Sequence, residues 1–147
     1  MKKSFITNCV IFLTSILVLF SCSNDDCYTP SENIIFEFVN ENDENLIENG
    51  FINSSSFGIN KIIDENRMIG IMGNRIENNQ LVLNSTISRY DGPQDFMLIL
   101  NTKPAKLLYF NIVSSKIQKC NAYNIHDVVF HDVKFYKQDV THYKIVL

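Results

Sequence analysis

The sequence predicts an all-β protein, built as a single antiparallel β-sandwich or a small barrel, and three observations predict it. The 147 residues, 46% hydrophobic and 20% charged, are enough for one globular domain and little else. Short runs of β-branched and aromatic residues are separated by turn signals about every 8–12 residues, a spacing typical of sandwiches and barrels. The sequence pattern shows no helical period with a capping residue, apart from a turn expected around 42–48.

The first half of the body contains four predicted strands, at 34–39, 59–63, 68–72 and 81–87. Within the first of them, Phe36 and Phe38 share one face because side chains alternate along a strand. Asn49-Gly50 tolerates positive φ at both central positions of a turn and therefore predicts a hairpin. Gly92-Pro93 predicts the firm turn that ends this half.

The second half contains five predicted strands, at 96–100, 107–113, 125–130, 133–136 and 143–147. Residues 96–100 are all apolar, which is typical of a central strand buried on both faces. We therefore expect one domain over 33–147, either a sandwich of the immunoglobulin or transthyretin kind or a small barrel. A domain of this length can bury a core of its own.

The amino terminus has the features of a secretory signal. Met1-Lys2-Lys3 is basic, the run 10–20 is apolar and uncharged, and the small residue Ser21 follows it. The apolar run has 11 residues, whereas a membrane-spanning helix needs about 20. We therefore expect a helical signal peptide over 1–21 rather than a membrane span.

Leu19-Phe20-Ser21-Cys22 resembles the lipobox of bacterial lipoproteins. The resemblance implies that the Cys22 thiol carries diacylglycerol, that the preceding peptide is removed, and that a further acyl chain such as palmitate blocks the new amino terminus. Several acyl chains hold a soluble domain on a membrane essentially permanently. If Cys22 is instead an ordinary thiol, the mature protein is simply secreted.

The residues after Cys22 also resemble a known pattern. Ser23-Asn24-Asp25-Asp26 is similar to the acidic export tag of Bacteroidota surface lipoproteins, which implies an outer-membrane location facing the cell exterior. The alternative is a solvated tether over 22–32, with the domain on the periplasmic face. Farther on, Glu44-Asn45-Leu46 after an aromatic strand resembles small Bacteroidota lipoproteins, which implies a compact β-sandwich without an assigned activity.

The charge distribution argues against nucleic acid as a partner. Without the signal, the chain from Cys22 has 11 basic and 16 acidic residues, a net charge of −5. Residues 22–80 carry −8 and residues 81–147 carry +3, with the lysines scattered rather than clustered. Nucleic-acid phosphates require a cationic surface, which this balance does not supply.

Two cysteines remain to be explained once Cys9 is removed with the signal and Cys22 is lipidated. In an oxidising compartment, Cys27 and Cys120 are candidates for a disulfide. Such a bridge would close a loop of more than 90 residues, worth ~4–5 kcal/mol in the chain-entropy treatment. Two free thiols, or pairing with another chain, are the alternatives.

Candidate chemistry is sparse. His126 and His131 each precede an Asp, but their odd separation places them on opposite faces of a regular strand. They could share a metal only if a bulge or turn fell between them, so we interpret them as surface residues. The serine clusters 54–56 and 114–115 have no nucleophile elbow and are predicted to lie in loops.

These observations predict a non-catalytic surface lipoprotein, without a cofactor, whose sandwich is an interaction or structural module held to the membrane by its lipid. The alternative is an accessory protein that captures polysaccharide or another polymer beside an outer-membrane transporter. The chain has no Trp to form a sugar platform, although its six Tyr could serve. A metal-dependent hydrolase that uses His126 and His131 is the third and least favoured hypothesis for the function.

Overall fold

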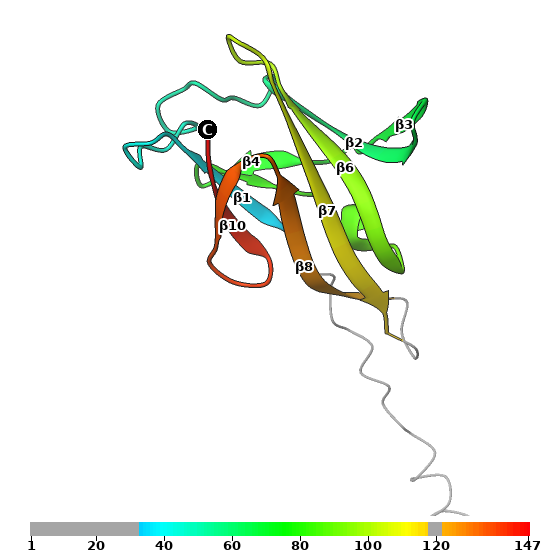
Figure 1. The fold of residues 1–147 in the computed structure, drawn as a ribbon. Coiled ribbons are helices and arrows are strands. Elements are labelled where there is room, and N and C mark those ends of the chain that lie inside the picture. Colours follow the sequence, from blue (N-terminus) through cyan, green and yellow to red (C-terminus); the bar gives the residue numbers. More distant parts are fainter. Residues whose placement is uncertain (1–32, 118–121) are drawn as a thin grey trace, which may run out of the picture.

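The computed structural model describes residues 33–117 and 122–147, which form two five-stranded sheets (Figure 1). The β1 sheet contains, in spatial order, β4 (Arg75–Glu77), β5 (Gln80–Val82), β1 (Ile35–Val39), β10 (His142–Val146) and β9 (Lys134–Lys137). The β6 sheet contains β3 (Arg67–Gly70), β2 (Phe57–Asp64), β6 (Gly92–Leu100), β7 (Lys106–Lys116) and β8 (Tyr123–His131). The predicted all-β sandwich is confirmed, and the barrel alternative is wrong because the two sheets remain separate.

One strand pair departs from the antiparallel pattern. β1 and β10, the first and last strands of the described chain, pair in parallel, with Phe36 opposite Tyr143 and Phe38 opposite Ile145. All the other strand pairs in the two described sheets are antiparallel. Because β1 and β10 run the same way, both end at the same margin of the sheet, with Val39 beside Val146.

Aromatic rings fill the space between the sheets. Phe36 is fully buried, and its ring centroid lies 5.4 Å from that of Phe110 and 5.0 Å from that of Phe130. Both contacts are edge-to-face, an arrangement worth ~0.5–1.5 kcal/mol per pair beyond the burial itself. Phe38 is also fully buried, which confirms the prediction that Phe36 and Phe38 share the core-facing side.

The sandwich is closed on one side by the corner between β8 and β9. The buried hydroxyl of Tyr143, on β10, accepts a hydrogen bond from Val128 N on β8 at 3.1 Å and donates one to Val140 O at 2.7 Å. Nearby, Lys137 Nζ on β9 lies 2.7 Å from Asp127 Oδ1 on β8. β8 and β9 belong to different sheets and form no backbone hydrogen bonds with each other as strands. At this margin, the side chains of Tyr143 and Lys137 therefore make the polar contacts between the two sheets.

Several predicted elements have different limits in the structure. The 96–100 prediction is confirmed, since these residues lie in the central strand β6. Gly92-Pro93 begins β6 instead of ending a turn, with Pro93 opposite Val113. The predicted strand 81–87 is split, because Asn84 accepts a hydrogen bond from Thr86 N and caps the short 3-10 helix η1 (Ser85–Ser88).

The Asn49-Gly50 dipeptide forms a turn but not a hairpin. Gly50 has φ of +78°, as the turn prediction requires. The hairpin prediction is wrong because β1 pairs with β5 and β10, and the chain after the turn crosses to β2 in the other sheet. Asn49 N donates to Asn45 O at 3.2 Å, so a single helical turn does occur where the sequence predicts one.

The predicted signal peptide (1–21), the tether (22–32) and the residues Cys22, Cys27 and Cys120 lie outside the described residues. Within the described part of the chain, no helix is long and apolar enough to cross a membrane.

Candidate functional site

The two histidines singled out from the sequence lie on β8 but do not come together. A bulge falls between them, because Val113 pairs with Asp127 while Ser114 pairs with Ile125, leaving His126 as the extra residue. The bulge reverses the predicted alternation, so both histidines are exposed on one face. They remain about 13–16 Å apart along the strand. In the ranges 33–117 and 122–147, no three His, Cys, Asp or Glu side chains gather as a metal site.

His126 does contact a serine that the sequence places in a loop. Strand β7 extends to Lys116, so Ser114 and Ser115 are strand residues and the loop prediction for them is wrong. Ser115 Oγ and His126 Nε2 are 2.6 Å apart across the β7–β8 ladder. A hydrolytic triad also needs a carboxylate to orient the imidazole. Among the described residues, His126 donates no hydrogen bond to a carboxylate, so the Ser115–His126 pair links two strands.

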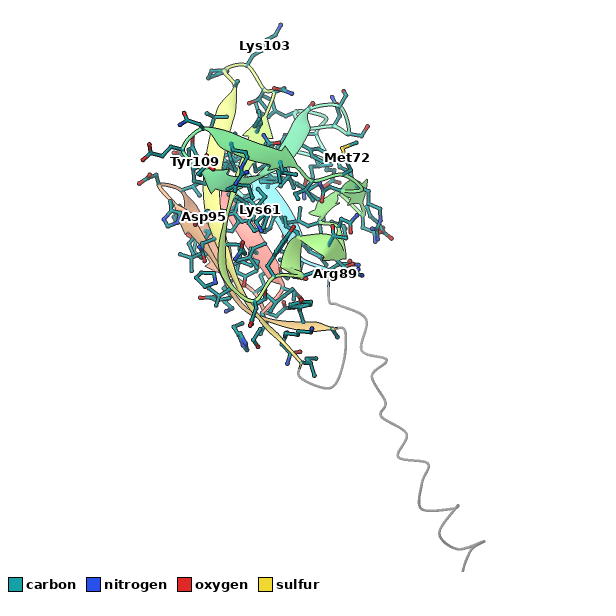
Figure 2. All side chains as sticks on the ribbon, turned by 90° about the vertical axis from the view of Figure 1, so that its right-hand side faces the viewer. Lys61, Met72, Arg89, Asp95, Lys103 and Tyr109 are labelled. Carbon is teal, nitrogen blue, oxygen red and sulfur yellow. The ribbon has the colours of Figure 1, made fainter. Side chains whose placement is uncertain are left out.

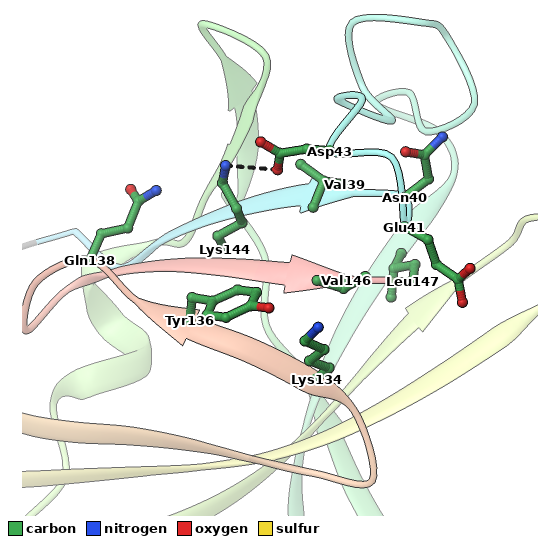
Figure 3. A pocket seen from close by; sticks show the side chains of 10 residues that line it. All are labelled: Val39, Asn40, Glu41, Asp43, Lys134, Tyr136, Gln138, Lys144, Val146 and Leu147. Carbon is green, nitrogen blue, oxygen red and sulfur yellow. Dashed lines mark hydrogen bonds and ion pairs between the residues drawn. The ribbon is translucent and has the colours of Figure 1, made fainter.

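A depression of about 790 Å³ lies on the outer face of the β1 sheet (Figure 3). Its apolar floor consists of Val39, Val146 and Leu147. Its polar lining consists of Asn40, Glu41, Asp43, Lys134, Tyr136, Gln138 and Lys144. A concave surface with an apolar floor and a few convergent polar groups is the usual form of a binding site.

Strand register brings these side chains together from distant parts of the chain. Lys144 on β10 is opposite Glu37 on β1 and Tyr136 on β9. One step farther along, Val146 is opposite Val39 and Lys134. Side chains two residues apart on a strand share a face, so both rows point outward from the sheet.

The loop after β1 supplies the acidic side of the depression. Asn40 Oδ1 accepts hydrogen bonds from Asn42 N at 2.9 Å and Glu44 N at 3.0 Å, and Asp43 has φ of +64°. This Asx turn directs Asp43 over the sheet. The sequence predicts a turn around 42–48 but does not place Asp43 over the sheet. The run 40–45 begins with Asn40 and alternates acidic and amide residues, and this pattern could have predicted an ordered Asx turn.

The two lysines of the depression differ in their electrostatic surroundings. Lys144 Nζ lies 3.0 Å from Asp43 Oδ1 (Figure 3) and 3.9 Å from Glu37 Oε1. The hydrogen bond to Asp43 and the charge of Glu37 raise the pKa of Lys144, so its ammonium group fixes the loop to the sheet.

Lys134 has no carboxylate within 4 Å among the described residues. Its Nζ lies 5.3 Å from the Tyr136 ring centroid, and hydrogen bonding to the Tyr136 hydroxyl raises the pKa of Lys134. Lys134 is therefore a charged donor with capacity for an additional acceptor.

A smaller depression of about 390 Å³ adjoins the first and shares three residues with it, Lys134, Val146 and Leu147. It extends to Lys106 and Leu107 at the start of β7.

Elsewhere, Lys61 on β2 is a buried cation that sequence patterning does not single out. Its side chain is 8% exposed, and its Nζ lies 3.1 Å from the Tyr90 ring centroid. Burial lowers the pKa of Lys61, whereas the ring face favours the charged form. The contact joins β2 to the segment between η1 and β6, which is a structural role.

No known protein family, curated protein or solved structure matches the chain.

Proposed function

We propose that the chain is a lipid-anchored surface protein whose β-sandwich is a non-catalytic binding module, with the depression on the β1 sheet as its binding surface. The depression itself is the observation that supports a binding role. It combines an apolar floor, a half-exposed Tyr136 and the ammonium group of Lys134, which has no carboxylate within 4 Å among the described residues. Lipidation of Cys22 rests on the lipobox-like residues Leu19-Phe20-Ser21-Cys22.

The position of the depression in the fold supports presentation away from the membrane. The tether from Cys22 to Asn33 spans 11 residues and can reach at most about 36–40 Å. β1 begins just after Asn33 and runs toward Val39, and the parallel strand β10 ends beside it. Val39, Val146 and Leu147 therefore lie at the opposite end of β1 and β10 from Asn33, the first described residue. The C-terminus at this end is marked in Figure 1.

Anchoring is tested by fractionating cells that express the Cys22→Ala variant. We expect the wild type in the membrane fraction and Cys22→Ala outside it, while Cys27→Ala as a matched control stays with the membrane. Membrane retention of Cys22→Ala would contradict the proposed anchor. Biotinylation of intact cells with an impermeant reagent separates the two faces, since only a protein on the exterior is labelled.

Polysaccharide capture is the second candidate function, and Tyr136 is the observation that favours it. The ring is 49% exposed within the depression, and the amides of Asn40 and Gln138 lie on the same lining. An exposed ring can stack on the apolar face of a sugar, and amides both donate and accept hydrogen bonds to hydroxyl groups.

A glycan array followed by titration of the best-bound glycan tests this candidate. We expect Tyr136→Ala to weaken binding at least tenfold, since an interface anchor is worth about 1.4 kcal/mol or more. Tyr109→Ala is the matched control, because Tyr109 is 42% exposed on the outer face of the other sheet. A flat array, or equal loss in both variants, would exclude polysaccharide binding at the depression.

A further inference from the structure

One row of side chains along β9 presents three different chemical groups to the depression. Lys134, Tyr136 and Gln138 are each two residues apart, so all three point to the same face and line the depression from its β9 side (Figure 3). Gln138 N donates to His142 O at 2.9 Å, which continues the pairing with β10 beyond Lys137. The row therefore presents a cation, a ring and an amide over about 13 Å.

Of the two lysines of the depression, Lys134 is the one whose charge is available to a ligand. Lys144 is held by Asp43 at 3.0 Å, whereas Lys134 has no carboxylate within 4 Å among the described residues. Hydrogen bonding to the Tyr136 hydroxyl, and more weakly the charge of Glu41, raises the pKa of Lys134. Lys134 is therefore an ammonium group throughout the neutral range and can bind one negative charge.

This ammonium group lies beside an exposed aromatic ring. Lys134 Nζ is 5.3 Å from the Tyr136 ring centroid, and Tyr136 is 49% exposed. A sugar that stacks on this ring has its substituents next to the ammonium group. In a uronic acid the carboxylate is bonded directly to the sugar ring, so its charge and its apolar face are adjacent in the same way. The depression thus matches the two parts of an acidic sugar.

We propose that the depression binds a glycan that contains a uronic acid, with the sugar ring on Tyr136 and its carboxylate on Lys134. Gln138 on the β9 side and Glu41 on the loop side accept hydrogen bonds from hydroxyl groups of the glycan. The proposal rests on polysaccharide capture, the second candidate function, and names the class of sugar that is captured.

The acidic residues of the depression favour an isolated carboxylate over a densely charged polymer. Glu41 and Asp43 line the side opposite the β9 row, and the chain as a whole is negatively charged. These charges repel a polymer that carries an anionic group on every residue. The single cation Lys134 therefore fits a uronic acid that alternates with neutral sugars.

Paired oligosaccharides test the proposal on the full chain. Glycans in which a uronic acid alternates with a neutral sugar are titrated in their native form and after reduction of the carboxylate to an alcohol. We expect the best-bound native glycan to bind about fivefold more tightly than its carboxyl-reduced form, which is the effect of one exposed ion pair. The difference should shrink as the salt concentration rises from about 0.1 M to about 1 M, because salt screens exposed charges.

The Lys134→Gln variant separates the effect of the charge from that of stacking. We expect it to weaken binding of the native glycan about fivefold and to leave binding of the carboxyl-reduced glycan within about twofold of the wild type. Tyr136→Ala should weaken binding of both forms. Lys103→Gln is the matched control, since Figure 2 shows Lys103 projecting into solvent from the loop between β6 and β7, and it does not line the depression.

Each contrary outcome overturns a stated part, in variants whose melting temperature matches the wild type. Equal affinity for native and reduced glycans, with both still weakened by Tyr136→Ala, would overturn the uronic-acid assignment and leave polysaccharide capture in place. Absence of binding to every glycan would overturn both, while membrane anchoring keeps its own test. Equally tight binding of oligo-glutamate would identify an acidic peptide as the ligand instead. Tight binding of dextran sulfate that Lys134→Gln does not weaken would place the anion-binding surface elsewhere.

Discussion

Tyr143→Phe removes one hydroxyl from the corner that holds β9 and β10 in place beneath the depression. That hydroxyl accepts from Val128 N at 3.1 Å and donates to Val140 O at 2.7 Å, and the residue is fully buried. Burial raises the pKa of the Tyr143 phenol above its ordinary value. The hydroxyl therefore stays protonated, and able to donate, throughout the neutral range.

The expected cost of Tyr143→Phe follows from these contacts. A hydrogen bond contributes about 1 kcal/mol net, and a buried N–H left without a partner costs about 1–3 kcal/mol. The ring and its packing against Phe36 and Phe130 remain in the variant. We therefore expect a loss of about 2–3 kcal/mol in the free energy of unfolding. For a domain of this size that corresponds to about 8–12 °C in melting temperature.

Urea denaturation at pH 7 measures this loss, with Tyr109→Phe as the matched control. Tyr109 is 42% exposed, so its hydroxyl can exchange to water and the variant should change stability by less than about 0.5 kcal/mol. Equal stability of Tyr143→Phe and the wild type would refute the view that this hydroxyl joins the two sheets. Above pH 10 the wild type should lose stability, because the unfolded phenol ionises before the folded one; Tyr143→Phe should lack this contribution.

Three further changes test other parts of the structure. Phe36→Ala leaves a cavity at the centre of the core and should cost about 3–5 kcal/mol by denaturant unfolding, whereas a loss below 1 kcal/mol would contradict the described packing. Gly73→Ala should cost about 2 kcal/mol or more, because Gly73 has φ of +82° and an added Cβ would collide with Asn84 Nδ2; an unchanged melting temperature would argue against this close approach. Asp139 accepts hydrogen bonds from two backbone N–H groups, which lower the pKa of its carboxyl group. Its contribution should be present above about pH 4 and lost as the pH falls through the folded pKa, so the stability difference between wild type and Asp139→Ala at pH 6 should narrow as the pH falls below 4.

The sequence predicts best the strands whose burial is uniform. Residues 96–100 are all apolar and form the second half of β6, and Phe36 and Phe38 mark the inner face of β1 by simple alternation. β4 escapes prediction because its three residues include a single apolar side chain, Ile76. The signal lies in the following turn, where Asn78 and Asn79 both have positive φ and join β4 to β5 as a two-residue hairpin.

The candidate site could not be predicted, because it depends on register between strands far apart in the sequence. Val39 and Val146 become neighbours only through the parallel pairing of β1 with β10. The residues within either strand do not predict which distant strand it pairs with. The exposed face shared by His126 and His131 likewise depends on a bulge in the pairing of β8 with β7. In a regular strand, residues five apart lie on opposite faces. The extra residue at the bulge shifts the alternation by one, so His126 and His131 lie on the same face.

We propose that lipid on Cys22 holds this sandwich at a membrane surface. Intact-mass spectrometry of the protein extracted from membranes tests this proposal. We expect a chain that begins at residue 22 and carries the added mass of a diacylglycerol group and an amide-linked acyl chain. A chain with an unmodified amino terminus, whatever its first residue, would contradict it.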